Sequence, residues 1–124
     1  PNLASNIETV KTRLYSTIPW LKEILSYGNA WLTGSTLLWA VSKECVPSDV
    51  DIFVEDGYFQ SFQHIVGNIV GTHNLTEVSR SNHKVRYIIG DGISFAHRLD
   101  LFCTSIERVS KFHLPCVRMC FNGE

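Results

Sequence analysis

The chain has 124 residues, of which 44% are hydrophobic and 19% are charged, and its formal net charge is −1. This length and composition predict a single globular domain with a core that needs no disulfide or metal to stabilise it. The near-neutral charge argues against a strongly basic nucleic-acid-binding surface, and no apolar run approaches the ~18 residues of a membrane-spanning helix.

Residues 1–28 are predicted to form helices that belong to the scaffold. Apolar residues recur there at helical spacing and would face the core: Ile7, Val10, Leu14 and Ile18. Pro19 interrupts the pattern, because proline suits the first turn of a helix better than its interior. We therefore expect one helix from about Ser5 and a second from Trp20 to Ser26.

A strand, a glycine turn and a helix are predicted next. Trp31-Leu32-Thr33 is apolar and favours a strand, Gly34-Ser35 breaks it, and residues 36–41 have a helical pattern. A glycine turn from a strand into a helix presents backbone N–H groups and the positive end of the helix to a phosphate.

The segment from Asp49 to Val54 alternates polar and apolar residues, which predicts a strand with one buried face. Asp49 and Asp51 then share a face, with Cα atoms roughly 6.6 Å apart at about 3.3 Å of rise per residue. Two such anions repel each other by about 4 kcal/mol at roughly 4 Å and an effective dielectric of about 20. The pair therefore points to a bound cation, the alternative being the solvated face of an edge strand.

The rest of the core is predicted as one helix followed by three strands. The helix covers Gly57 to Val70, two strands cover Leu75–Ser79 and Lys84–Ile89, and a third strand covers Ile93–Cys103. The last strand carries Asp100. A phosphate-binding turn, a carboxylate pair and a third carboxylate form a set that suits two-metal phosphoryl transfer.

These segments resemble the DNA polymerase β-like nucleotidyltransferase superfamily over roughly residues 30–103. The matching residues are Gly34-Ser35, Asp49-x-Asp51 followed by Ile52-Phe53-Val54, and Asp100 within Leu99-Asp100-Leu101-Phe102. The resemblance implies an α+β fold, with a mixed or antiparallel sheet and helices packed on one face. It also implies a catalytic core over 29–104, and the pattern of the residues that follow predicts a C-terminal strand segment over 105–124 within the same domain.

The resemblance further implies an enzyme that moves a nucleoside monophosphate from a nucleoside triphosphate, such as ATP, to an acceptor hydroxyl and releases pyrophosphate. Asp49, Asp51 and Asp100 would bind two Mg²⁺ or Mn²⁺ ions, and Gly34 and Ser35 would hold the pyrophosphate. The acceptor stays open among an RNA end, a protein and a small molecule. The alternatives are a non-catalytic module that binds nucleotide or a protein partner, and a structural domain with an acidic edge.

The alternation of side chains also indicates which basic residues could lie on the same sheet face as the aspartates. Arg98 shares the face of Asp100, opposite the apolar Leu99 and Leu101, and Lys84 and Arg86 share one face of their strand. If that face is also the face of the aspartates, Arg86 and Arg98 would lie near a bound triphosphate. The alternative is that both are surface charges.

The cysteines and the two ends of the chain complete the sequence predictions. The four cysteines contain no C-x-x-C pair, and they are Cys45, Cys103, Cys116 and Cys120. We expect buried, reduced cysteines of a cytoplasmic protein; a zinc site at His113, Cys116 and Cys120 is the alternative. Pro1 at the start and the turn signal Asn122-Gly123 at the end predict a piece of a larger protein or polyprotein.

Overall fold

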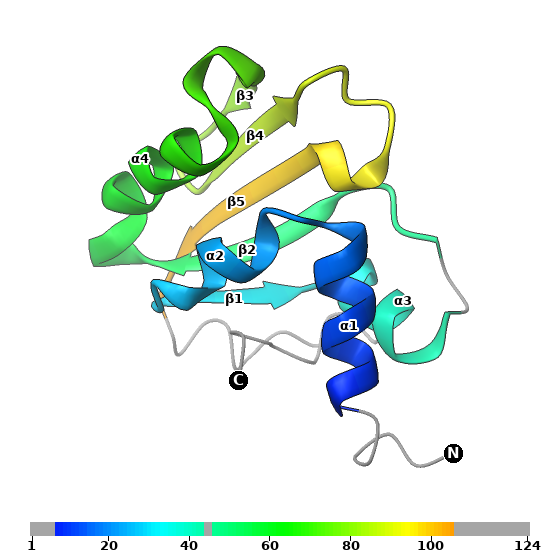
Figure 1. The fold of residues 1–124 in the computed structure, drawn as a ribbon. Helices are drawn as coiled ribbons and strands as arrows, with labels where there is room; N and C mark the ends of the chain where they lie inside the picture. The colour runs from blue at the N-terminus through cyan, green and yellow to red at the C-terminus, as the bar shows by residue number, and fades with distance from the viewer. Residues whose placement is uncertain (1–6, 44–45, 106–124) are drawn as a thin grey trace.

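A five-stranded mixed sheet organises the chain, as the computed structural model shows for residues 7–43 and 46–105 (Figure 1). The strand order is β1-β2-β5-β4-β3. Among the described strands only β2 and β5 pair in parallel, and the other neighbours are antiparallel. The α+β class predicted from the sequence is confirmed. The strands are β1 (Ala30–Thr33), β2 (Val50–Glu55), β3 (Leu75–Arg80), β4 (Lys84–Ile89) and β5 (Arg98–Thr104).

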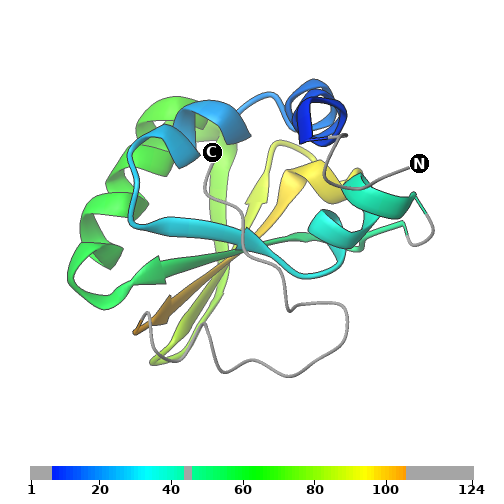
Figure 2. The same cartoon turned by 90° about the horizontal axis from the view of Figure 1, so that it is seen from below.

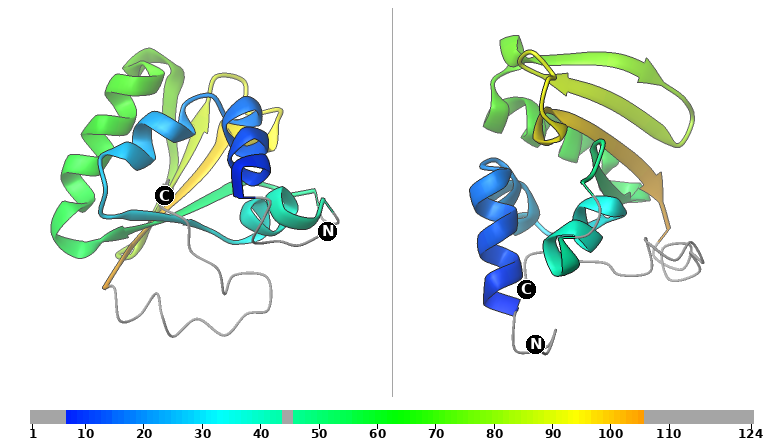
Figure 3. Two further views of the ribbon diagram at one scale, coloured as in Figure 1. Left: turned by 60° about the horizontal axis from the view of Figure 1, so that its bottom comes forward. Right: turned by 90° about the vertical axis from the view of Figure 1, so that its right-hand side faces the viewer.

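Helices cover one face of this sheet (Figure 2). α1, α2 and α4 lie on that face, whereas α3 lies beside the end of β1 and packs on α1 (Figure 3). Within the described part of the chain, no helix is long and apolar enough to cross a membrane. The helices are α1 (Ile7–Thr17), α2 (Leu21–Ser26), α3 (Ser35–Ser42) and α4 (Phe59–Val70).

The N-terminal helices break where the sequence predicts. Leu14 and Ile18 are fully buried, and the chain leaves the helical path around Pro19 before α2 begins. The indole Nε1 of Trp20 then donates a hydrogen bond of 3.0 Å to the carbonyl oxygen of Ala96. This bond joins the start of α2 to the turn before β5, so the helical layer is attached to the N-terminal end of the central strand, which carries Asp100.

One predicted element is wrong at its start: the last strand begins at Arg98, not at Ile93. A 3-10 turn over Phe95–His97 precedes it. The hydroxyl of Ser94 accepts a hydrogen bond of 3.2 Å from the N–H of Ala96, and this local bond favours a turn over an extended strand. The other elements lie close to their predicted ends.

The sheet face opposite the helices carries two neighbouring rows of side chains, which the strand register defines. Thr33, Asp51, Asp100 and Arg86 are paired in one row across β1, β2, β5 and β4. Two residues further along, the second row pairs Trp31, Phe53, Phe102 and Lys84. The alternate residues on β2 and β5 are buried under the helices, so alternation assigned both faces correctly: Val50, Ile52, Leu99 and Leu101.

Several predictions lie outside the described residues. These are the C-terminal strand segment after residue 105, the capping residue Ser5, the zinc site at His113, Cys116 and Cys120, and Cys45. Cys103 is a free thiol in the described region, partly exposed, with its Sγ 3.4 Å from a carboxylate oxygen of Asp56. It is therefore not the fully buried cysteine that we expect from the sequence.

The buried face predicts a sharp contrast between two valines. Val85 on β4 is fully buried, whereas Val78 on β3 is 49% exposed. We expect Val85→Ala to lower the free energy of unfolding by roughly 2–3 kcal/mol, because it removes buried methyl groups and leaves a cavity. Val78→Ala should cost less than about 1 kcal/mol. Urea unfolding followed by circular dichroism measures both, and equal losses would contradict the assignment of faces.

Candidate metal centre

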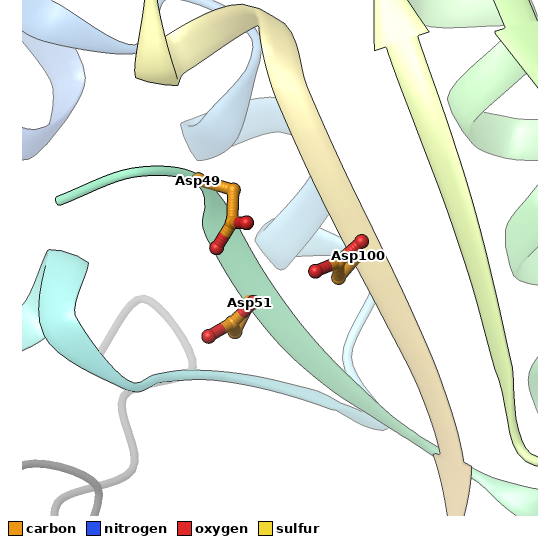
Figure 4. A group of neighbouring side chains, drawn as sticks. All are labelled: Asp49, Asp51 and Asp100. Carbon is orange, nitrogen blue, oxygen red and sulfur yellow. The ribbon is translucent and has the colours of Figure 1, made fainter. Parts of the chain in front are cut away.

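The three predicted carboxylates meet at one place on the sheet face opposite the helices. Asp51 on β2 and Asp100 on β5 are register partners, and Asp49 directly precedes β2. One carboxylate oxygen from each lies within 4.8 Å of the others. Figure 4 shows the three side chains gathered beside the two strands. The prediction that the third aspartate joins the pair is confirmed.

Parallel pairing is what brings the third aspartate to the pair. In the parallel ladder Asp51 lies opposite Asp100, while the apolar residues on either side of each point into the core. Because side chains alternate between the faces, a slip of one residue between β2 and β5 would place either Asp51 or Asp100 among apolar side chains. The hydrophobic core therefore enforces the acidic cluster.

Asp51 is the carboxylate whose ionisation the surroundings oppose. Its pKa is raised from the ordinary 3.8 to about 7, first by burial and then by the charges of Asp49 and Asp100, while Lys84 lowers it in part. A divalent cation relieves both causes, since it replaces lost hydration and neutralises the neighbouring charges. Aspartate oxygens are the ligands that hard cations such as Mg²⁺ prefer, so Asp49, Asp51 and Asp100 could hold a metal ion.

Gly34 forms the wall of this centre next to Asp51. Its φ of +82° is a conformation that favours glycine. A Cβ atom at this position would lie 2.7 Å from Oδ2 of Asp51, so any side chain here would collide with the carboxylate. The N-cap residue of α3 is Gly34, which has no side chain that could cap the first backbone N–H groups of the helix. The turn is thus next to the carboxylates, as the sequence predicts.

Thr36 is a positioning residue that the sequence did not reveal. Its hydroxyl donates a hydrogen bond of 2.8 Å to the carbonyl oxygen of Asp49 and is fully buried. The bond joins the first turn of α3 to the residue before β2, and so fixes the distance between the glycine turn and the carboxylates. A polar residue within the apolar pattern of α3 was the available signal.

Two cations from β4 lie against Asp100. Arg86 donates from Nε to Oδ1 at 2.8 Å and from Nη2 to Oδ2 at 3.0 Å, and Nη2 is also 3.5 Å from Oδ2 of Asp49. Lys84 Nζ lies 3.6 Å from Oδ2 of Asp100. Alternation placed Lys84 on this face but did not suggest its contact. Three carboxylates therefore face two cations, and this excess of negative charge favours a further cation.

Arg98 has different partners from those that the sequence suggested. Its guanidinium donates to three backbone carbonyl oxygens, those of Gly92 at 2.8 Å, Ile93 at 2.6 Å and Ser48 at 2.9 Å. It thereby joins the loop before β2 to the loop before β5. The described contacts make Arg98 a support for the residue next to Asp49, and its contact with phosphate stays a prediction.

The raised pKa of Asp51 predicts a pH dependence for the metal-free protein. Between about pH 4 and about pH 7 the folded protein holds a proton that the unfolded chain releases. The stabilisation of the fold by this proton is therefore complete below about pH 4 and is lost as the pH rises through about 7. We expect wild type to be on the order of 2 kcal/mol less stable at about pH 8 than at about pH 5 in EDTA.

Urea unfolding of Asp51→Asn should show a smaller difference between the two pH values. The matched control is Glu23→Gln, which removes an exposed carboxylate on α2 and should keep the wild-type difference. If the free energy of unfolding of Asp51→Asn changes between the two pH values as much as that of wild type, the pKa assignment is contradicted.

Comparison with known proteins identified no relative of this chain. No protein-family model matches the chain, and no curated protein and no solved structure matches it either. The nucleotidyltransferase resemblance accordingly rests on the glycine turn and the three aspartates, whose mutual positions the structure gives.

Proposed function

We propose that this domain is a metal-dependent nucleotidyltransferase that transfers a nucleoside monophosphate from a nucleoside triphosphate to an acceptor hydroxyl. The observation that carries the proposal is the meeting of Asp49, Asp51 and Asp100 beside the turn at Gly34. In such a reaction the hydroxyl oxygen forms a bond to the α-phosphorus, the bond from that phosphorus to the leaving pyrophosphate breaks, and the hydroxyl loses its proton.

In this proposal Asp49 and Asp51 hold two Mg²⁺ or Mn²⁺ ions at the sheet face, and Asp100 completes the second site. Bound there, the ions neutralise phosphate charge and lower the pKa of the acceptor hydroxyl. The carboxylates fit hard cations by chemistry, spacing and charge. Their backbone positions are set by the β2–β5 register, so the ligands are held in place before an ion arrives.

The residues around the carboxylates would hold the phosphates. Gly34 and Ser35 offer uncapped N–H groups at the start of α3, where the helix dipole favours an anion such as the leaving pyrophosphate. Arg86, whose side chain is 43% exposed and lies 3.5 Å from Asp49, would pair with the triphosphate. Arg98 would contribute by fixing the loop that carries Ser48 and by offering its remaining N–H groups.

The metal centre predicts that Mg²⁺ stabilises the folded protein. At ten times its dissociation constant an ion contributes about 1.4 kcal/mol, which corresponds to a rise in Tm of roughly 5 °C. Asp51→Asn should abolish the rise, whereas Asp91→Asn, at an exposed carboxylate outside the centre, should keep it. The rise should be larger at about pH 8 than at about pH 6, because metal binding requires the deprotonated Asp51. A rise that survives Asp51→Asn would contradict the site.

Transfer itself is tested with a nucleoside triphosphate labelled at the α-phosphate, incubated with RNA, protein and small-molecule acceptors. We expect label on one class of acceptor, reduced by about 10²-fold or more in Asp51→Ala and unchanged in Asp91→Asn, because Asp51 belongs to the centre and Asp91 does not. Absence of transfer to every acceptor, with Mg²⁺ and nucleotide binding retained, would instead indicate a non-catalytic module.

A further inference from the structure

One guanidinium bridges two of the three carboxylates of the centre. Arg86 lies opposite Asp100 in the β4–β5 ladder, forms a two-armed hydrogen bond to it, and lies 3.5 Å from Asp49. The Asp100 side chain is 3% exposed and that of Arg86 is 43% exposed. The carboxylate is thus fixed in the sheet, and the guanidinium is the partner with room to move.

A divalent ion and this guanidinium would compete for the same oxygen atoms. The fork uses one lone pair on each oxygen of Asp100, and its second arm extends to Asp49. Like charges repel strongly at such short range, and an ion coordinated by Asp100 and Asp49 would lie within a few bond lengths of the guanidinium. Lys84 adds a second positive charge 3.6 Å from the same carboxylate.

We propose that Arg86 is a positioning residue that holds Asp100 and Asp49 in the metal-free domain and must move aside when a divalent ion enters, so that it sets the metal affinity of the centre. This inference rests on the metal centre of the proposed function. The phosphates of a nucleoside triphosphate offer the displaced guanidinium a new partner of the same chemistry as a carboxylate. Entry of the ion and entry of the triphosphate are therefore coupled through this side chain.

The chain contains a matched control for Arg86. Arg80 on β3 makes the same kind of fork, with both arms at 2.8 Å to Glu77, and the two side chains are about half exposed, at 50% and 41%. Arg80→Gln therefore removes the same charge and the same two-armed hydrogen bond, but the partner of Arg80 is Glu77 and not an aspartate of the centre. A change seen in Arg86→Gln and absent from Arg80→Gln belongs to the centre.

The test is a titration with Mn²⁺ alone, in which the electron paramagnetic resonance signal reports the free ion. Because the competing cation is removed, we expect Arg86→Gln to bind Mn²⁺ about tenfold more tightly than wild type. Arg80→Gln should match wild type, and Asp51→Asn should lose binding. Unchanged or weaker binding by folded Arg86→Gln, with wild type binding normally, would overturn the proposal.

A second measurement covers the case in which Arg86→Gln fails to fold, since it leaves the buried Asp100 without its main partner. The Nε–H resonance of Arg86 in wild type, assigned by its absence from Arg86→Lys, should shift and exchange faster with water as Mg²⁺ is added. A resonance that stays unchanged while Mg²⁺ raises the Tm would overturn the proposal.

The two proposals fail in different ways. Tighter Mn²⁺ binding by Arg86→Gln, in a protein that transfers no label, would support the role of Arg86 and overturn the enzyme. Label transfer by wild type, together with equal Mn²⁺ affinities of wild type and Arg86→Gln, would support the enzyme and overturn the role of Arg86. Mn²⁺ binding by none of the proteins would overturn both.

Discussion

Parallel pairing of β2 with β5 is the constraint on which the rest of the structure depends. It places Asp51 opposite Asp100, and the apolar residues that flank each aspartate along its strand keep that register because they are buried on the other face. Hydrophobic burial on one side of the sheet thereby pays the electrostatic cost of crowding negative charge on the other. The core and the acidic cluster are two consequences of one alignment.

Around this alignment each neighbouring element has a defined task. The glycine turn leaves space for the Asp51 carboxylate, and Thr36 joins that turn to the backbone of Asp49. Arg86 and Lys84 on β4 neutralise part of the charge from the far side of Asp100. Arg98 joins the two loops that precede β2 and β5. The centre is therefore supported from β1 to β4, which is what a preorganised ligand set requires.

The sequence predicted the composition of the centre well and its support poorly. Alternation placed Asp49, Asp51 and Asp100 correctly, because the period of a strand decides which side chains share a face. It could not show that β5 pairs in parallel with β2, since periodicity does not reveal which strands are neighbours. The start of β5 was wrong, because the hydroxyl of Ser94 makes a local bond that no pattern of hydrophobicity contains. The carbonyl partners of Arg98 depend on loop positions, which the sequence does not define.

The long separation of β2 and β5 along the chain has a consequence for synthesis. While a ribosome is still making α4 and the β3–β4 hairpin, β2 can pair with β1 only. Its other edge is unpaired because β5 has not yet been made. Such non-local pairing is slow, because a large loop must close before the contact forms. The acidic cluster therefore cannot form until β5 has been made, and a nascent chain that stops before β5 carries two aspartates but no centre.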